Sequence, residues 1–241
     1  MVYVIADIHG SNDRFDTMMR YVEHERPMME SDVVIIAGDA GLQYGAYNMG
    51  SIKKNMKYYD CKFVILRGNH DKRYWKEAKA HPEKWTIESD YAFENKYPNI
   101  LYVKDEGGIY NINGYKILFI PGGYSVDKDY RLKNGLPYEY DEELTYSEAN
   151  NLLRLAEMTE EYDFIISHVA PAKLYPKLSE FFMPCIDQSS VHDSVSELCD
   201  EIFEVGRWEM WFFGHYHGDK YFPEENMDMV YEKYGRLDDL M

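Results

Sequence analysis

Residues 1–10 read MVYVIADIHG, so that an apolar run at 2–6 leads directly into Asp7 and His9. The run is short and rich in β-branched and aromatic residues, which is typical of a buried strand. Four further runs of three to five residues share this character, and they occupy residues 33–37, 63–66, 164–166 and 210–213. Each of the five runs is followed closely by an Asp, Asn or His side chain.

Between these runs, three segments are predicted as amphipathic helices, because apolar residues recur there at spacings of three and four positions. They contain Phe15, Met18, Met19 and Val22; Ala149, Leu152, Leu153 and Ala156; and Val191, Val195, Leu198, Ile202 and Val205. The first follows N-cap candidates at 11–13, and the second follows a capping box formed by Thr145 and Glu148. Strands that alternate with helices in this way predict an α/β fold.

The middle of the chain has a different pattern. Residues 109–112 and 115–120 flank Asn113-Gly114, which is typical of a β-hairpin. Residues 122–143, GGYSVDKDYRLKNGLPYEYDEE, are predicted as a long loop, and loops of this length inside a compact domain are usually functional or disordered. Since the sequence contains neither an internal repeat nor a linker-like stretch, residues 1–241 are predicted to form one domain.

The chain is acidic, with 26 basic residues against 43 acidic ones and a formal net charge of −17. Such a surface repels long polyanions, so duplex nucleic acid is not an expected partner. A small phosphorylated substrate is compatible with it, because bound divalent cations make the local field positive. Without a signal peptide before the first motif or an apolar run near the roughly 18 residues of a membrane span, a cytoplasmic location is predicted.

Side chains of the types that bind metals follow the five apolar runs. In chain order they are Asp7 and His9; Asp39; Asn69, His70 and Asp71; His168; and His215 and His217. In open α/β folds, sites form beyond the carboxyl ends of the strands, so these side chains are predicted to meet at one edge. Hard oxygen ligands combined with imidazole nitrogens suit Mn, Fe, Zn, Ni or Mg. The pattern therefore predicts a site for divalent metal ions.

The same motifs, in the same order, resemble those of the calcineurin-like metallophosphoesterase family. They read Asp7-Ile8-His9, Gly38-Asp39, Gly68-Asn69-His70-Asp71, His168-Val169-Ala170-Pro171 and Gly214-His215-Tyr216-His217, and they span positions 7–217. The resemblance implies an α/β (α+β) fold of four layers, with two mostly β sheets face to face and helices outside. It also implies an enzyme in which a metal-bridging hydroxide attacks a phosphate monoester or diester.

The resemblance further implies a role for each motif residue. One divalent ion would be held by Asp7, His9 and His217, a second by Asn69, His168 and His215, and Asp39 would bridge the two. His70 would be the general acid for the leaving group, because imidazole titrates near neutral pH. Asp71 would orient His70.

The chain departs from the family pattern just after Asp39. Many relatives have an Asp-Arg pair where this sequence has Leu42 and Gln43. The Asp usually orients the catalytic His and the Arg usually grips phosphate, so both roles are unassigned here. A non-catalytic scaffold that docks a partner protein is therefore the alternative function, although the intact His70 favours an enzyme.

Substrate-binding residues are less strongly indicated. Arg67, Lys128 and Arg131 are candidate phosphate clamps, and the alternative for each is a solvated basic residue on an acidic surface. Four tyrosines of the 122–143 segment are candidates for stacking on a nucleoside, with ordinary packing as the alternative; they are Tyr124, Tyr130, Tyr138 and Tyr140. A nucleotide, a phosphoprotein and a phosphodiester all stay open as substrates.

Overall fold

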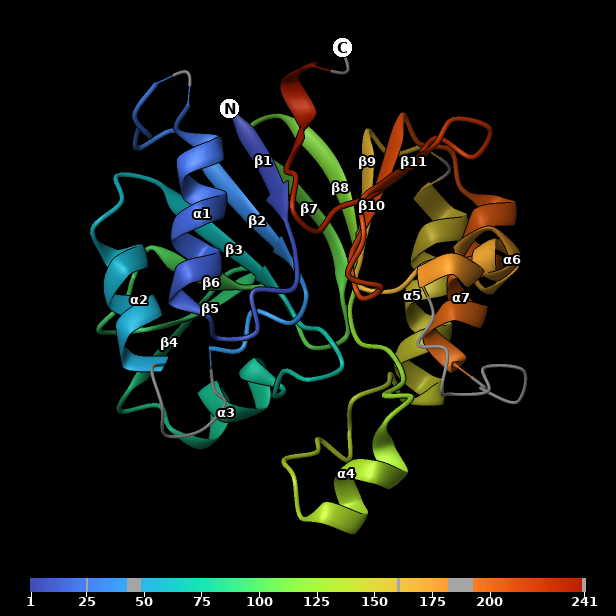
Figure 1. Ribbon diagram of the computed structural model, residues 1–241, viewed down its shortest axis with the longest axis horizontal. Helices are drawn as coiled ribbons and strands as arrows, with labels where there is room; N and C mark the ends of the chain where they lie inside the picture. Colours follow the sequence, from blue (N-terminus) through green and yellow to red (C-terminus); the bar gives the residue numbers. More distant parts are fainter. Residues whose placement is uncertain (25, 43–48, 160, 182–192, 240–241) are drawn as a thin grey trace.

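The computed structural model contains two β-sheets packed face to face, with helices on their outer sides (Figure 1). It describes residues 1–24, 26–42, 49–159, 161–181 and 193–239. The seven-stranded sheet contains β1 (Val2–Ile5), β2 (Val33–Ala37), β3 (Lys62–Leu66), β4 (Trp85–Glu88), β5 (Tyr91–Glu94), β6 (Ile100–Tyr102) and β13 (Gly235–Arg236). The six-stranded sheet contains β7 (Gly108–Ile112), β8 (Tyr115–Ile120), β9 (Phe164–Ser167), β10 (Met210–Phe213), β11 (Lys220–Phe222) and β12 (Met227–Met229).

Both sheets have parallel strands in the middle and antiparallel strands at the edges. The first has the order β13-β1-β2-β3-β6-β5-β4, in which β1, β2, β3 and β6 are parallel. The second has the order β11-β12-β10-β9-β8-β7, in which β12, β10, β9 and β8 are parallel. Because neighbouring parallel strands end at the same edge, the loops that follow β1, β2 and β3 lie side by side, as do those after β9 and β10.

Helices cover the outer face of each sheet. In Figure 1, α1 (Asn12–Val22), α2 (Met49–Lys57) and α3 (Tyr74–Ala80) lie with the first sheet, whereas α5 (Tyr146–Thr159), α6 (Tyr175–Leu178) and α7 (Ser194–Val205) lie with the second. Short 3₁₀ turns occur at Ala172–Leu174, Ser179–Phe181 and Leu237–Asp239. No helix in these described ranges is both long and apolar enough to cross a membrane.

Three apolar layers hold the four structural layers together. Alternate residues of a strand point to opposite faces, so Val2 and Val4 pack between the two sheets, whereas Tyr3 and Ile5 pack against the outer helices. Aromatic side chains of the second sheet, including Phe212, fill the space between the sheets from the other side. The four-layer α/β/β/α fold implied by the sequence motifs is therefore confirmed.

The predicted helix starts are also found in the structure. Ser11 caps α1 by accepting a hydrogen bond from the backbone N–H of Arg14 at 3.3 Å. The capping box of α5 is closed in both directions, because Glu148 accepts from the Thr145 backbone N–H at 2.8 Å and donates its own N–H to the Thr145 hydroxyl at 3.3 Å. The third predicted helix is α7, although Val191, the first residue of its predicted apolar pattern, lies outside the described residues.

The 122–143 segment is where the fold differs from the sequence prediction. The hairpin before it is present as β7 and β8, but the predicted loop contains a helix, α4 (Lys128–Asn134). An ion pair of 2.7 Å between Asp127 and Arg131 spans one turn of α4, and Gly135 ends the helix in the left-handed conformation, at φ 65°. None of its side chains is buried, and in Figure 1 it projects beyond the ends of the two sheets.

Candidate metal centre

The seven candidate metal ligands come from the loops that follow five parallel strands. Asp7 and His9 follow β1, Asp39 follows β2, and Asn69 follows β3; His168 follows β9, and His215 and His217 follow β10. The first four are on the first sheet and the last three on the second. The structure brings their ligand atoms together at the end of the sandwich where the two sheets face each other.

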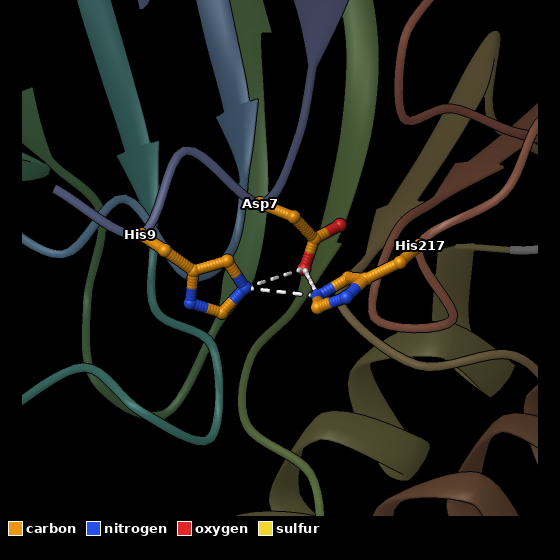
Figure 2. A group of neighbouring side chains, drawn as sticks. All are labelled: Asp7, His9 and His217. Atoms are coloured by element: carbon orange, nitrogen blue, oxygen red, sulfur yellow. Dashed lines mark hydrogen bonds and ion pairs between the residues drawn. The ribbon is translucent and has the colours of Figure 1, made fainter. Parts of the chain in front are cut away.

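Asp7, His9 and His217 form the first group of ligand atoms (Figure 2). The Nε2 atoms of His9 and His217 are 2.9 Å apart. They lie 3.8 Å and 3.7 Å, respectively, from Oδ1 of Asp7. Two imidazole nitrogens and one carboxylate oxygen that point at a common space are a suitable donor set for one divalent transition-metal ion.

Asn69, His168 and His215 form the second group. The Oδ1 atom of Asn69 lies 2.8 Å from Nε2 of His168 and 3.1 Å from Nδ1 of His215. The two imidazole nitrogens are themselves 3.3 Å apart. The group again offers two imidazole nitrogens and one oxygen, here from a neutral amide.

Asp39 lies between the two groups. Its Oδ2 atom is 3.8 Å from Nε2 of His9 in the first group and 3.6 Å from Nε2 of His168 in the second. Its Oδ1 atom accepts a hydrogen bond from the backbone N–H of His70 at 2.9 Å, which fixes the orientation of the carboxylate. The one carboxylate is thus within reach of both donor groups.

The backbone of these loops is strained where the candidate ligands occur. Eight non-glycine residues in the described part of the chain have a positive φ, and five of them are candidate ligands: Asp7, His9, Asp39, His215 and His217. This left-handed region is costly for residues with a side chain, and such strain is concentrated at functional sites.

Two glycines allow the loops to approach each other closely. A Cβ atom at Gly68 would lie 2.2 Å from Oδ1 of Asp39, and a Cβ atom at Gly214 would lie 2.4 Å from Oδ2 of Asp7. Both contacts are far closer than real side chains allow. The glycine before Asn69 and the glycine before His215 are therefore required for the carboxylates to occupy their positions.

Burial of the two carboxylates supports a bound cation. The side chain of Asp7 is 0% exposed, and its Oδ1 atom has no hydrogen-bond partner among the described residues, although it points at His9 and His217. An ionised oxygen without a partner is costly inside a protein. A divalent ion bound by Asp7, His9 and His217 would satisfy that oxygen, so the residues fit a metal.

The pKa values of the candidate ligands also reflect the burial of several charged groups close together. Burial and the nearby Asp39 carboxylate raise the pKa of Asp7 to about 7, although His168 opposes the shift. Burial by itself would lower the pKa of His168, but the Asp39 and Asp7 carboxylates raise it to about 9. Burial lowers the pKa of His217 to about 4 and that of His215 well below its ordinary value. The lowered pKa values of His215 and His217 favour the neutral imidazole, which is the form that binds metals, whereas the raised pKa of His168 favours its protonated form beside the two carboxylates.

A family model described as calcineurin-like phosphoesterase matches residues 1–219. The chain belongs to this family. Membership supports a phosphoester hydrolase, and the family is typically metal-dependent, in agreement with the two donor groups.

Solved structures with a similar fold are distant in sequence. The phosphopantetheinyl hydrolase PptH from Mycobacterium tuberculosis is 11% identical, with a TM-score of 0.47 over 96% of this chain and 89% of that one. A protein of unknown function from Aquifex aeolicus is 14% identical, with a TM-score of 0.46 over 97% and 89%. A third structure is 15% identical, with a TM-score of 0.51 over 95% and 88%, and supports the fold alone. A search of curated proteins found no match.

In this calcineurin-like phosphoesterase, residues outside the sequence motifs hold the first donor group. The ring of Tyr231 stacks on His217, with centroids 4.9 Å apart and planes 18° from parallel, and the guanidinium carbon of Arg14 lies 3.6 Å from the centre of the Tyr231 ring. Arg14 also donates from Nε to the Asp7 carbonyl at 2.7 Å. No local sequence pattern indicates Tyr231, because it lies 217 positions from Arg14.

Asp71 holds two loops together instead of contacting a reacting group. Its carboxylate accepts hydrogen bonds from the backbone N–H groups of Ala40, Gly41 and Gly68, at 3.2, 3.1 and 3.0 Å, and from the Tyr74 hydroxyl at 3.0 Å. These donors occupy both of its oxygens. Its partners therefore differ from the predicted role of orienting His70, and they tie the loop after β2 to the loop after β3.

His70 lies at the edge of the cluster and lines the pocket above it. Its Nε2 atom is 3.4 Å from Nη2 of Arg131, and its ring centroid is 5.8 Å from that of His9. Burial lowers the pKa of His70; the Asp39 carboxylate opposes this effect and the Arg131 guanidinium adds to it. Leu42, in the place where many family members have an Asp, is buried in the core beneath α1 and α2, whereas Gln43 lies outside the described residues.

A pocket of about 640 Å³ opens over the candidate ligands. It is lined by His9, Asp39, Asn69, His70, Tyr124, Ser125, Val126, Asp127, Arg131, Tyr175, Phe181, Asp193, His215, Tyr216 and His217. Among the four tyrosines considered for stacking, only Tyr124 belongs to this lining. Tyr130 and Tyr140 are exposed, and Tyr138 hydrogen-bonds to Glu142 at 2.9 Å.

The three candidate phosphate clamps have different positions. Arg131 lines the pocket, held by Asp127 and by the carbonyl of Pro137 at 3.1 Å. Arg67 is 1% exposed, is not part of the pocket lining, and donates from Nη1 and Nη2 to the carbonyl oxygens of Glu142 and Asp105. Lys128 is directed at the rings of Tyr124 and Tyr138, 5.7 and 5.3 Å away. The prediction of a clamp does not match the positions of Arg67 and Lys128.

Proposed function

We propose that this protein hydrolyses a small phosphate monoester with the help of two divalent metal ions. The observation that supports this best is the arrangement of the two donor groups around Asp39, together with the buried Oδ1 atom of Asp7, which has no hydrogen-bond partner among the described residues. Asp7, His9 and His217 would hold one ion, and Asn69, His168 and His215 the other, with Asp39 in contact with both. When bound, two such ions supply Lewis-acid chemistry that activates water and neutralises charge on phosphate.

His70 is proposed to donate a proton to the leaving oxygen of the ester. It is part of the pocket lining, its ring centroid lies 5.8 Å from that of His9, and its Nε2 atom lies 3.4 Å from Nη2 of Arg131. The lowered pKa of its imidazole opposes protonation, and the negative charge of a bound phosphate would raise that pKa again. Protonation of the leaving group is needed most when that group is a poor one, such as an alkoxide. The chain therefore has a group for each end of the reaction, with ligands for the ions on one side and an acid on the other.

Arg131 is proposed to bind the phosphate. Among the described residues that line the pocket, it is the one arginine or lysine. Its Nε pairs with Asp127 and its Nη1 with Pro137, so that Nη2 is presented toward His70. A single fixed guanidinium suits one terminal phosphoryl group, whose free oxygens accept its hydrogen bonds. A diester has fewer free oxygens, which favours the monoester.

The rest of the pocket suits a small organic group. Its volume lies within the range of about 300–1,000 Å³ that is usual for small-molecule sites. Tyr124 and Tyr216 contribute aromatic side chains to the lining, while Asp127 and Asp193 contribute acidic ones. Asp127 is paired with Arg131, and Asp193 caps α7 by accepting from the backbone N–H groups of Val195 and Ser196, so neither carboxylate is free to bind a cationic group. We infer a substrate with one phosphoryl group and a small organic remainder.

The proposal is tested by comparing p-nitrophenyl phosphate with bis-p-nitrophenyl phosphate, with Mn²⁺ and with a chelator. We expect Mn²⁺-dependent turnover that favours the monoester. In the variant Arg131→Met, KM for the monoester should rise by about 10–100-fold, because a charged hydrogen bond contributes about 1.5–3 kcal/mol. Lys128→Met is the matched control, since it removes a cation from the same helix outside the pocket.

Three results would contradict the proposal or one of its parts. Turnover that persists after the chelator has removed all metal would exclude the two-ion reaction. Metal binding without turnover of any ester in a panel of monoesters, diesters and phosphopeptides would favour the alternative, a non-catalytic scaffold that docks a protein. Equal KM changes in Arg131→Met and Lys128→Met would contradict the proposed phosphate-binding role of Arg131.

A further inference from the structure

The amide of Asn69 is bound at both ends. Its Oδ1 atom faces His168 and His215, and its Nδ2 atom donates a hydrogen bond of 2.8 Å to Oγ of Ser125. The Ser125 hydroxyl in turn donates to the carboxylate of Glu142. Glu142 is 2% exposed although it belongs to the projecting 122–143 segment, so it is a buried acid with no role in the reaction described above.

The hydrogen bonds that link Asn69, Ser125 and Glu142 can be donated in one direction only. A carboxylate accepts hydrogen bonds, and a serine hydroxyl has a single proton to donate. Because that proton is directed at Glu142, Oγ of Ser125 must accept a hydrogen bond from Asn69, and only the NH₂ end of the amide can donate one. The amide oxygen of Asn69 is therefore left facing His168 and His215.

Further hydrogen bonds hold the Glu142 carboxylate in place. Its Oε1 atom accepts from the Ser125 backbone N–H at 3.1 Å and from the Tyr138 hydroxyl at 2.9 Å. Burial raises the pKa of Glu142, and the hydrogen bonds from Ser125 and Tyr138 lower it. The network also joins the two ends of the segment that contains α4, since Ser125 precedes the helix and Glu142 follows it.

We propose that Ser125 and Glu142 are positioning residues for Asn69, which orient its amide oxygen toward one of the two metal ions and strengthen it as a ligand. The inference rests on the proposed two-ion function. Partners behind a metal ligand fix its orientation, and their loss typically costs about 10–100-fold in metal affinity. A negative charge at the far end of a hydrogen-bonded chain also polarises the groups between. The effect should be confined to the ion held by Asn69, His168 and His215.

The test is a titration of chelator-stripped protein with Mn²⁺, followed by calorimetry and by the electron paramagnetic resonance signal of coupled Mn²⁺ ions. Wild-type protein should bind two ions. Ser125→Ala should weaken one of them by about 10–100-fold and leave the other nearly unchanged, with a smaller loss at the same ion in Glu142→Gln. Tyr138→Phe is the matched control, because it removes a hydrogen bond to Glu142 and leaves the chain from Asn69 to Glu142 intact.

A double-mutant cycle separates positioning from general support of the fold. If Ser125 acts through Asn69, adding Ser125→Ala to Asn69→Ala should cause no further loss of Mn²⁺ affinity. Additive losses, equal weakening of both ions, or a Tyr138→Phe variant that matches Ser125→Ala would overturn the positioning role. Wild-type protein that binds fewer than two ions would instead overturn the proposed function, so the two failures are distinguishable.

Discussion

Asp39→Asn removes a charge from the centre of the two donor groups while preserving the shape of the side chain. In the structure, one Asp39 oxygen lies 3.8 Å from Nε2 of His9 and 3.6 Å from Nε2 of His168, so the lost charge affects both groups. At about 4 Å and an effective dielectric constant of about 20, a pair of unit charges interacts by about 4 kcal/mol. A loss of about 4 kcal/mol per ion corresponds to about 10³-fold in Kd.

The assay is metal analysis after dialysis, combined with turnover of p-nitrophenyl phosphate. We expect Asp39→Asn to lose both ions and detectable turnover, while it stays folded, because the retained Oδ1 atom still accepts from the His70 backbone N–H. Asp105→Asn is the matched control. Asp105 is also buried and accepts from the backbone N–H groups of Trp75 and Lys76 at 3.1 and 3.0 Å, away from the pocket. It should keep both ions. Two tightly bound ions and near wild-type turnover in Asp39→Asn would refute the bridging role.

Two further predictions concern the proton donor and the stability of the fold. His70→Ala should retain both ions and slow alkyl phosphates by about 10²–10⁴-fold, but slow p-nitrophenyl phosphate much less, because nitrophenolate leaves without a proton; equal losses on the two substrates would mean that His70 positions the site instead. Burial by itself would raise the pKa of Asp32, but Arg26 and the amino group of Met1 lower it below its ordinary value. Its contribution to folding is therefore present above about pH 4 and lost as the pH falls. The unfolding free energies of wild type and Asp32→Asn should differ at pH 7, and this difference should shrink progressively as the pH falls from about 4 to about 2. A difference that stays constant over this range would contradict this account.

The sequence predicted the parts of the fold that have a local pattern. The five buried runs, three helices and the hairpin at Asn113-Gly114 are all present, since each depends on spacing or turn chemistry within a few residues. The short strands β11, β12 and β13 have two or three residues each and depend on pairing with a neighbouring strand rather than on a local sequence pattern. The α4 helix escaped prediction because it buries no side chain, so it has no apolar periodicity to recognise.

The candidate site, too, was predictable only where it depends on a local sequence pattern. The seven ligand candidates follow strands, and the ends of strands can be recognised in a sequence. Their meeting point could therefore be predicted. Their roles as metal ligands stay a prediction. The partners that hold them were not predictable: Ser125 lies 56 positions from Asn69, and Tyr231 lies 217 positions from Arg14. The prediction that Arg67 binds phosphate does not match its position in the structure. Its place next to a motif does not reveal whether the side chain faces a ligand or is buried next to Gly122, as it is here.

Anomalous diffraction from crystals of Mn²⁺-loaded protein tests the two-metal centre most directly. We expect two peaks in the pocket, one in contact with Asp7, His9 and His217 and the other with Asn69, His168 and His215, with Asp39 in contact with both. The same preparation should hydrolyse p-nitrophenyl phosphate, and removal of the ions should abolish that activity. A single peak, peaks outside these residues, or undiminished turnover by metal-free protein would contradict the two-ion centre.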